Sequence, residues 1–370
     1  MRRLVALDLA GGDDFVSQLT RAWERGDAVL PLDQRLSPAT RRRIAASLGA
    51  SQVVTPDDSF ALDGGSDVEE GDALVVATSG TTGHPKGVVL THAAVQASAM
   101  MSAIAIGQNS DDRWLACLPV AHVGGLSVIT RALHTGVGLS VLPGFDADSV
   151  MIESRRCTLV SLVATVLRRI EPSRFRRILL GGGRPPLDRP TNTVATYGLT
   201  ETGSGIAYDG VPFDGVGISF APDGEILVKS PTAMRCYRDG STAVDSDGWL
   251  HTADIGHLDE TGRLIVRGRR GDMIITGGEK VWPDAVEAIA NEVDPSGDHV
   301  VVGVDDEEWG QQVVLVTTSE NIDLDTVRTV VRERIAPYAA PRRLVRVAAI
   351  PRTSIGKVAR AEVRSMVPDK

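Results

Sequence analysis

The stretch ALVVATSGTTGHPKG, residues 73–87, gives the clearest indication of how this chain folds and what it binds. Its first six residues form a short apolar run, which predicts a buried strand. The ten residues from Thr78 to Gly87 include no large apolar side chain, so they add nothing to a core. Glycines let the backbone turn its amides inward, hydroxyl groups add donors and a lysine adds a cation, so the loop suits phosphate oxygens. The residues that we expect to hold them are Thr78, Ser79, Gly80, Thr81, Thr82, Gly83 and Lys86.

The loop differs from the P-loop, whose pattern is G-x-x-x-x-G-K-[ST]. Lys86 stands three residues beyond Gly83, and Gly87 follows it where a P-loop has a magnesium-binding hydroxyl. The alternative is a polar turn that joins a strand to a helix and binds nothing. The lack of core-forming side chains favours phosphate binding.

Outward from this loop, apolar runs alternate with segments of helical length. This alternation predicts an α/β fold with layered, mainly parallel sheets and helices on both faces. The chain is expected to pass from the loop into an alanine-rich helix at about residue 92. Expected strands cover residues 73–78, 114–119, 139–142, 158–163, 178–180 and 194–197, and expected helices cover 14–25, 38–48, 92–105, 125–133 and 146–155.

The pattern changes after Gly210. Runs at 225–229 and 263–267, each preceded by a turn that contains Asp and Gly, predict a β-meander. The last hundred residues predict a small α+β module, with helices at 283 onward and at 324–335 and strands at 299–304, 311–318 and 344–350. We therefore expect a large domain over residues 1–268 and a small domain over residues 269–370.

The composition indicates a globular chain, with 42% hydrophobic residues, 24% charged residues and a net charge of −9. This negative charge repels phosphate backbones, so no nucleic acid partner is expected.

No stretch approaches the ~20 uncharged apolar residues of a membrane span, and Asp8 precedes any secretory apolar core. Three scattered cysteines are too few for a disulfide framework or a zinc cluster. We expect a cytoplasmic protein with small-molecule substrates, and a homodimer is one possible assembly.

A second group of residues suits the base and the metal of a nucleotide. Three glycines follow the apolar run at 178–180, and glycines after a strand let the backbone approach a flat ring closely. A tyrosine can stack on such a ring, and a glutamate offers the hard oxygen that Mg²⁺ prefers. Taken alone, the sequence Tyr-Gly-Leu-Thr-Glu is more typical of a turn than of a nucleotide site. The residues are Gly181, Gly182, Gly183, Thr196, Tyr197, Gly198, Thr200 and, for the metal, Glu201.

These two motifs closely resemble the phosphate loop and the adenine and magnesium motif of the adenylate-forming superfamily. This superfamily includes acyl-CoA synthetases, firefly luciferases and peptide-synthetase adenylation domains. Stretches 248–254, 268–280 and 351–360 resemble further signatures of the family in the same order. Five signatures in order over residues 78–360 make an accidental match negligible. The resemblance implies a large ATP- and acyl-binding domain and a small, mobile C-terminal lid.

The resemblance also implies roles for residues near the middle of the chain. Asp254 matches the aspartate that accepts hydrogen bonds from both ribose hydroxyls, and Arg269 matches an arginine that contacts ribose or phosphate. Ala253 stands where the family more often has glycine. That small change should leave the carboxylate in place.

Further roles implied by the resemblance concern the lid. Gly271 occupies the pivot position, where many relatives have Asp or Lys, and glycine can absorb a large dihedral change. Gly277 and Gly278 would lie beside the channel for the CoA thiol. Lys357 matches the catalytic lysine, which can neutralise charge in the transition state together with Lys86. The alternative, a surface lysine, is weakened because the chain has only five lysines.

The implied reaction has two steps. A carboxylate attacks the α-phosphate of ATP, which releases pyrophosphate and leaves an acyl adenylate, and the CoA thiol then displaces AMP. The implied cofactors are ATP, Mg²⁺ and coenzyme A, the last as a substrate. Positioning and charge neutralisation supply most of the lowering of the barrier.

The segment LPVAHVGGL, residues 118–126, resembles the wall of the acyl pocket in aryl- and acyl-CoA synthetases. His122 is the candidate catalytic and pocket residue, and Gly124 and Gly125 would let an acyl group pass close to the backbone. Ser127 is a further candidate for the pocket. The alternative for His122 is a hydrogen-bonded core histidine.

The compact length, the arginine-rich composition and the His-Val-Gly-Gly-Leu segment most resemble the o-succinylbenzoate-CoA ligases of menaquinone biosynthesis in actinobacteria. Their substrate is a dicarboxylate, so a donor or cation must hold its second carboxylate, and Ser127 and Arg131 are candidates. A benzoate, a coumarate or another short acyl acid is an alternative substrate. A non-catalytic adenylate-binding protein is the second alternative.

Overall fold

The computed structural model describes residues 2–78, 85–183, 185–186, 188–352 and 358–368. Five predicted loop residues and the predicted catalytic lysine lie outside the described residues. The chain divides into two compact units. The first comprises Met1–Ser219, Leu227–Thr252 and Asp259–Leu264, and the second comprises Phe220–Ile226, Ala253–Leu258 and Ile265–Lys370. The domain boundary after residue 268 stays a prediction. These six predicted site residues are Ser79, Gly80, Thr81, Thr82, Gly83 and Lys357.

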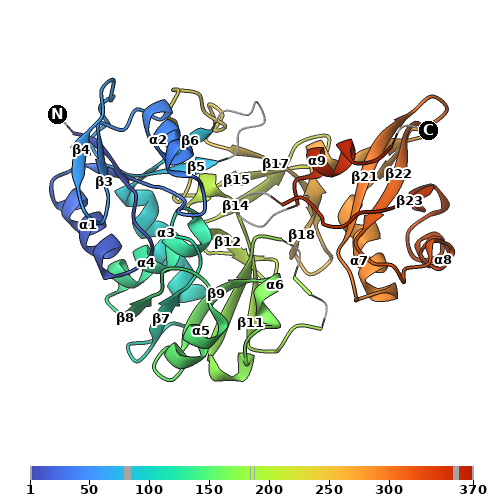
Figure 1. Cartoon of the computed structure of the whole chain (residues 1–370), viewed down its shortest axis with the longest axis horizontal. Helices are drawn as coiled ribbons and strands as arrows, with labels where there is room; N and C mark the ends of the chain where they lie inside the picture. The colour runs from blue at the N-terminus through green and yellow to red at the C-terminus, as the bar shows by residue number, and fades with distance from the viewer. Residues whose placement is uncertain (1, 79–84, 184, 187, 353–357, 369–370) are drawn as a thin grey trace. The chain divides into compact units, whose positions relative to one another are not determined.

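The first sheet of the first unit has, within the described residues, seven strands in the order β16-β6-β5-β2-β1-β3-β4. Figure 1 labels β3, β4, β5 and β6 of this sheet. The strand predicted at 73–78 is confirmed as β5 (Asp72–Thr78), whose first five residues are buried. It pairs in parallel with β2, which pairs in parallel with β1. The other strands are β1 (Leu4–Leu7), β2 (Ala28–Pro31), β3 (Gln52–Val54), β4 (Ser59–Ala61), β6 (Lys86–Thr91) and β16 (Cys236–Tyr237).

Two parts of this sheet were not expected from the sequence. Strands β1 to β4 each span only three or four residues, and so short a run carries little periodicity. The chain also forms β6 before the alanine-rich helix starts, and β6 runs antiparallel to β5. The expectation of a loop that leads straight into a helix was therefore wrong, because strand β6 lies between the predicted loop and the helix.

The second sheet of the first unit has the order β13-β12-β11-β10-β9-β7-β8 in the described part of the chain. Its five predicted strands are confirmed and pair in parallel, and β12 and β13 extend it antiparallel. Alternate residues of β9 and β10 pack into one apolar cluster with Cys117 and Cys157. The strands are β7 (Arg113–Ala116), β8 (Gly138–Val141), β9 (Leu159–Val163), β10 (Arg177–Gly181), β11 (Thr193–Gly198), β12 (Gly205–Tyr208) and β13 (Val211–Pro212).

The helices of the first unit have clear local causes. The side chain of Thr91 accepts a hydrogen bond from Ala94 N, so α3 begins directly after β6 at the predicted residue. Ser37 caps α2, whose first residue is Pro38. Helix α4 ends at Gly136, which adopts φ 71°. The helices are α1 (Asp13–Glu24), α2 (Pro38–Ser47), α3 (His92–Ala105), α4 (Val123–Thr135), α5 (Ala147–Glu153) and α6 (Ala164–Leu167).

The second unit contains the predicted α+β module. Alternate residues of its central strands face opposite sides, so the sheet has two cores. One core joins Val301, Val313 and Leu315 to helices α7 and α8, and the other joins Val300 and Val314 to α9 and its neighbourhood. The elements are β19 (Ile274–Thr276), β20 (Glu279–Val281), α7 (Pro283–Val293), β21 (His299–Asp306), β22 (Gly310–Thr317), α8 (Leu324–Arg334), β23 (Arg343–Arg346) and α9 (Arg360–Ser365).

The predicted meander is confirmed as a sheet in the order β14-β15-β17-β18, whose strands supply residues to both units. Short 3₁₀ turns complete the elements of the described chain. No helix among the described residues is both long and apolar enough to cross a membrane. The remaining elements are β14 (Gly217–Phe220), β15 (Glu225–Lys229), β17 (Leu250–Leu258), β18 (Leu264–Arg269), η1 (Pro172–Arg174), η2 (Thr200–Thr202), η3 (Arg270–Asp272) and η4 (Pro337–Ala339).

Candidate active site

The loop end of the β5–β6 hairpin presents the described residues of the predicted phosphate loop. Thr78 and Lys86 are cross-strand partners, and Thr78 Oγ1 donates a hydrogen bond to Lys86 O over 3.3 Å. Because β5 is paired on both edges, the two ends of the loop start from a fixed base. The hairpin thus holds the Lys86 backbone next to Thr78.

Lys86 and Glu201, which belong to two different predicted motifs, both contact Tyr237. The Lys86 Nζ atom lies 4.7 Å from the centroid of the Tyr237 ring, and Tyr237 Oη donates to Glu201 Oε1 over 2.9 Å. Tyr237 was not predicted from the sequence. It lies 36 positions from Glu201 along the chain, so no local motif joins the two.

The predicted adenine residues come together at the ends of two neighbouring strands. Strand β10 ends at Gly181 and β11 ends at Gly198, and the two strands run in parallel, so both segments leave the same edge of the sheet. Thr196 Oγ1 donates to Leu180 O over 3.1 Å, and it lies 3.0 Å from where a Cβ on Gly181 would be. The two predicted segments are therefore adjacent.

Glycine at position 198 is required by close packing. A Cβ there would lie 2.1 Å from Ser204 O, because the chain turns back at once through η2 into β12. This turn also carries Thr200 and Glu201, and the peptide of Met234 donates to Glu201 O over 2.7 Å. The backbone of the predicted metal ligand is thus fixed.

His122 lies beside a carboxylate that was not predicted from the sequence. His122 Nε2 is 3.1 Å from Asp33 Oδ2 and 2.9 Å from Arg35 Nη2. Asp33 is buried, and although burial alone would raise the pKa of its carboxyl, hydrogen bonds from His122 and Arg35 hold that pKa well below its usual range. The His122 side chain is 26% exposed, so it has access to solvent, and it forms a polar cluster with Asp33 and Arg35.

The two glycines after His122 have different surroundings. A Cβ on Gly125 would lie 2.4 Å from Leu118 O and 2.5 Å from Pro119 O, whereas a Cβ on Gly124 would meet only Leu118 Cδ1 at 3.5 Å. Gly125 is thus required where the first turn of α4 packs on its own preceding backbone. Its contact with an acyl group stays a prediction.

Ser127 and Arg131 lie one helical turn apart on α4 and meet the β11–β12 turn. Ser204 Oγ donates to Ser127 Oγ over 3.2 Å, and Arg131 Nη2 lies 3.4 Å from Ser204 Oγ. Arg131 is 1% exposed, and its guanidinium carbon lies 4.7 Å from the centroid of the Trp114 ring. Its Nε and Nη1 atoms have no hydrogen-bond partner among the described residues, and burial lowers its pKa. A buried, incompletely paired cation is costly without an anion.

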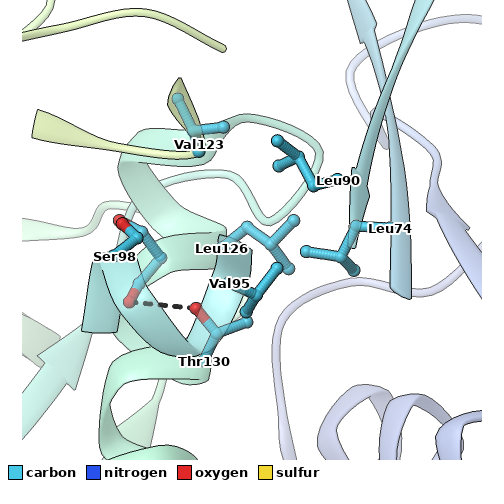
Figure 2. Close-up of a pocket in the computed structure, with 9 residues that line it drawn as sticks. Leu74, Leu90, Val95, Ser98, Val123, Leu126 and Thr130 are labelled. Atoms are coloured by element: carbon cyan, nitrogen blue, oxygen red, sulfur yellow. Dashed lines mark hydrogen bonds between the residues drawn. The ribbon is translucent and has the colours of Figure 1, made fainter. Parts of the chain in front are cut away.

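A small apolar cavity lies beside Ser127 (Figure 2). The side chains of Leu90, Val95 and Leu126 point toward one another in it. It lies where α3 and α4 meet the β5–β6 hairpin. Its lining residues are Leu74, Leu90, Val95, Ser98, Val123, Leu126, Ser127, Thr130 and Gly203.

In the second unit, Asp254 forms an ion pair with Arg269, with Nε and Oδ1 2.9 Å apart. Asp254 is only 7% exposed. The residue before it, Ala253, adopts φ 58°, a left-handed conformation that favours glycine. This explains in physical terms why a glycine would suit that position.

A buried glutamate, which was not predicted from the sequence, supports this strained turn. Glu225 Oε1 accepts a hydrogen bond from Ala253 N over 2.8 Å, and Glu225 Oε2 pairs with Arg270 Nη2 at 2.9 Å. Arg270 also pairs with Asp223 at 2.7 Å. Strand β15 and the η3 turn thus fix the backbone that carries Asp254.

The three predicted lid glycines differ in what requires them. Gly277 adopts φ 57° and Gly278 φ 84°, so both occupy the left-handed region. Gly271 lies in the η3 turn, has no positive φ, and a Cβ there would meet no atom within 4 Å. Neither packing nor conformation therefore demands glycine at 271, and its role as a pivot stays a prediction.

The ends of the segment that carries Lys357 are anchored within the second unit. Arg352 and Val358 form an antiparallel bridge, and Arg352 Nη2 pairs with Asp298 Oδ2 at 2.7 Å. Arg360, which begins α9, pairs with Asp284 and Glu287. These two carboxylates hold the pKa of Arg360 above its ordinary value despite burial.

The donor set suits one magnesium ion shared with a nucleotide. Over the described ranges, no group of three His, Cys, Asp or Glu side chains could hold a metal by itself. Mg²⁺ commonly takes one or two carboxylates together with phosphate oxygens and water. Glu201, half-buried and oriented by a tyrosine hydroxyl, fits such a ligand.

Comparisons with known proteins show the family of the chain. Residues 66–238 match the AMP-binding enzyme family and residues 285–357 match the AMP-binding enzyme C-terminal domain. The 2-succinylbenzoate–CoA ligases of Bacillus anthracis and Bacillus cereus are each 34% identical over 337 residues, which is 80% of this chain and 70% of theirs.

Solved structures give the same result. The o-succinylbenzoate CoA synthetase of Bacillus subtilis, in complex with its acyl-adenylate intermediate, has a TM-score of 0.86 at 27% identity and covers 98% of this chain and 89% of its own. The same enzyme with ATP and a magnesium ion has a TM-score of 0.85 at 27% identity, with 98% of this chain and 90% of its own covered. The chain therefore belongs to the AMP-binding enzyme family, as one of its AMP-forming acid–CoA ligases.

Proposed function

We propose that this enzyme joins o-succinylbenzoate to CoA with ATP, giving o-succinylbenzoyl-CoA, AMP and pyrophosphate, as a step of menaquinone biosynthesis. The observation that carries the proposal is the 34% identity to the Bacillus 2-succinylbenzoate–CoA ligases over 80% of the chain. Its use of ATP and CoA supports a cytoplasmic location, and a homodimer stays a prediction.

In the first step, one carboxylate oxygen of the acid forms a bond to the α-phosphorus of ATP. The bond from that phosphorus to the bridging oxygen breaks, and pyrophosphate leaves. No proton need move, so the chain has only to align the reactants and neutralise charge. Lys86 is proposed to do so on the pyrophosphate side with the loop residues 78–83, and Lys357 at the reacting carboxylate.

Membership of the AMP-binding enzyme family supports the proposed nucleotide contacts. Segments 181–183 and 196–200 would hold adenine, and Asp254, already oriented by Arg269, would accept the ribose hydroxyls. Glu201 would hold Mg²⁺, which, when bound, offsets charge on the phosphate oxygens.

In the second step, the CoA sulfur forms a bond to the acyl carbonyl carbon and the bond to AMP breaks. The thiol proton leaves to solvent or to AMP. Gly277 and Gly278 are proposed to line the thiol channel, and Gly271 is proposed as the pivot between the two steps.

For the second carboxylate of the acid, Arg131 and Ser127 are the proposed partners. Two nitrogens of Arg131 lack hydrogen-bond partners among the described residues, and Ser127 lines the apolar cavity nearby. His122, Gly124 and Gly125 are proposed to form the adjoining wall. A benzoate or a coumarate, with one carboxylate, would leave this cation unpaired.

The test supplies the protein with ATP, Mg²⁺, CoA and a panel of acids, and measures AMP release and the mass of the thioester. We expect kcat/KM for o-succinylbenzoate to exceed that for benzoate and coumarate.

The variant Arg131→Lys should lower kcat/KM for o-succinylbenzoate about tenfold or more, since a bidentate partner is lost. The same variant should change kcat/KM for benzoate little. Preference for a monocarboxylate would support the alternative substrate, and no turnover with any acid would support a non-catalytic protein.

A further inference from the structure

Tyr237 contacts two residues of the proposed ATP site that come from separate motifs. Its hydroxyl donates to the Glu201 carboxylate over 2.9 Å, and its ring lies under the Lys86 ammonium at 4.7 Å. One side chain thus touches both the proposed metal ligand and the proposed phosphate cation.

Strand pairing places Tyr237 on this face. Strand β16 runs antiparallel to β6, and Tyr237 is directly opposite Val88. Side chains two residues apart on a strand share a face, so Lys86 and Val88 lie on the same side as the tyrosine ring. The contact with Lys86 is therefore a diagonal cross-strand pair.

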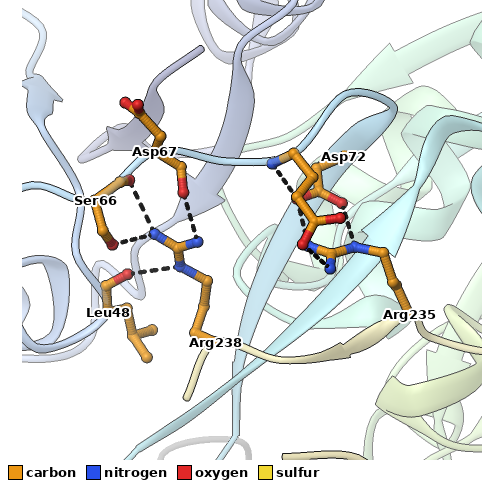
Figure 3. Close-up of polar contacts among 7 residues, drawn as sticks. Leu48, Ser66, Asp67, Asp72, Arg235 and Arg238 are labelled. Atoms are coloured by element: carbon orange, nitrogen blue, oxygen red, sulfur yellow. Dashed lines mark hydrogen bonds and ion pairs between the residues drawn. The ribbon is translucent and has the colours of Figure 1, made fainter. Parts of the chain in front are cut away.

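Two arginines that flank Tyr237 fix its short strand (Figure 3). Arg235 forms a bidentate pair with buried Asp72, with nitrogen–oxygen distances of 2.9 and 2.8 Å. Arg238 donates to Leu48 O over 3.0 Å and to Ser66 O over 3.0 Å. Because both anchors belong to the first unit, the tyrosine starts from a rigid backbone.

We propose that Tyr237 is a positioning residue that orients Glu201 toward a bound metal and holds Lys86 toward the phosphates. This inference rests on the proposed function. A tyrosine hydroxyl that donates to one carboxylate oxygen fixes the rotamer of the glutamate and leaves its second oxygen for a metal. Such outer partners tune metal affinity, and the ring face stabilises an ammonium ion by a cation–π contact.

A purely structural tyrosine offers the matched control. Tyr208 is 6% exposed, and its hydroxyl pairs with Ser102, so its hydrogen bond joins two core side chains. The variants Tyr237→Phe and Tyr208→Phe each remove one hydroxyl from the first unit. Only the former alters a partner of Glu201.

The experiment measures binding of α,β-methylene-ATP by titration calorimetry with and without Mg²⁺. Its α–β bridge is a methylene group that is not cleaved, so this analogue cannot transfer its adenylyl group to an acid. For Tyr237→Phe we expect the gain in affinity due to Mg²⁺ to fall about tenfold, with metal-free affinity unchanged. For Tyr208→Phe we expect a lower unfolding temperature and an unchanged gain. Tyr237→Leu should in addition weaken metal-free binding about two- to fivefold, because Lys86 loses its ring.

The proposal would be overturned if Mg²⁺ raised the nucleotide affinity of Tyr237→Phe as much as that of the wild type. It would also be overturned if this increase in affinity fell equally in Tyr237→Phe and Tyr208→Phe. If the wild type itself gained nothing from Mg²⁺, the metal role of Glu201 and the tyrosine inference would both fail. If the gain fell as expected but no acid were turned over, the tyrosine inference would stand and the proposed ligase function would fail.

Discussion

At the scale of single residues, the turn before Asp254 stores backbone strain. Ala253 is one of two described non-glycine residues with a positive φ, and Glu225 holds its amide. A left-handed L-residue costs about 1–2 kcal/mol. The chain maintains this conformation next to a proposed ribose ligand, where strained backbone commonly serves a site.

Replacing Ala253 with glycine should therefore stabilise the protein. We expect the free energy of unfolding to rise by about 0.5–1 kcal/mol. The relief of backbone strain in the folded state should exceed the cost of ordering glycine, which has more conformational freedom in the unfolded chain. Urea denaturation measures this. The control Ala97→Gly, inside α3, should lower it by about 1 kcal/mol. A loss of stability in both variants would contradict the strain.

Residue-scale prediction from the sequence succeeded where the signal was local. The strand before the phosphate loop and the start of α3 depend on neighbouring residues. Tyr237 and Glu225 escaped notice because their partners lie 36 and 28 positions away. Asp33, which is 89 positions from His122, escaped for the same reason. Such pairs are set by strand order, which one sequence does not state.

At the scale of elements, the first turn of α4 gives two adjacent glycines different packing environments. Gly125→Ala should lower the free energy of unfolding by about 1–3 kcal/mol, because its Cβ would meet two rigid carbonyl oxygens. Gly124→Ala should raise it by up to about 1 kcal/mol through helix propensity. Thermal denaturation of the two variants checks this. Equal effects would show that α4 can shift away from residues 118 and 119.

Asp294, which directly follows α7, should make the stability of the second unit depend on pH. Asp294 accepts hydrogen bonds from Ser296 and Ser319, which lower its pKa to about 2 from 3.8. The folded carboxylate therefore binds its proton less readily than the unfolded one, so it stabilises the fold above about pH 4, and this stabilisation is lost as the pH falls toward 2.

The variant Asp294→Asn should accordingly be less stable than the wild type at neutral pH, and the difference should shrink as the pH falls from 4 to 2. Denaturation midpoints at a series of pH values measure it. A difference that stays constant with pH would assign the effect to packing alone.

At the scale of the whole molecule, the proposed chemistry needs residues from both units. Lys357→Ala should lower the adenylation rate about 100-fold or more while ATP still binds, because a cation aimed at transition-state charge is removed. Pyrophosphate exchange measures the adenylation rate, and nucleotide titration measures ATP binding.

The control is Lys229→Ala, which should leave the adenylation rate and ATP binding unchanged. In the contacts described, the Lys229 ammonium donates a hydrogen bond only to Asp247 O. An unchanged exchange rate in Lys357→Ala would contradict its role.

The paired strands of the first sheet also limit how the chain can be cut. The AMP-binding match begins at residue 66, yet β1 to β4 lie before it and β2 covers one side of β5. A fragment of residues 66–238 would expose the hydrogen-bonding groups of β5 and the apolar residues that Leu4 and Leu30 cover. Expressed alone, it should collect in the insoluble fraction, so homology limits are poor guides to an autonomous folding segment in this enzyme.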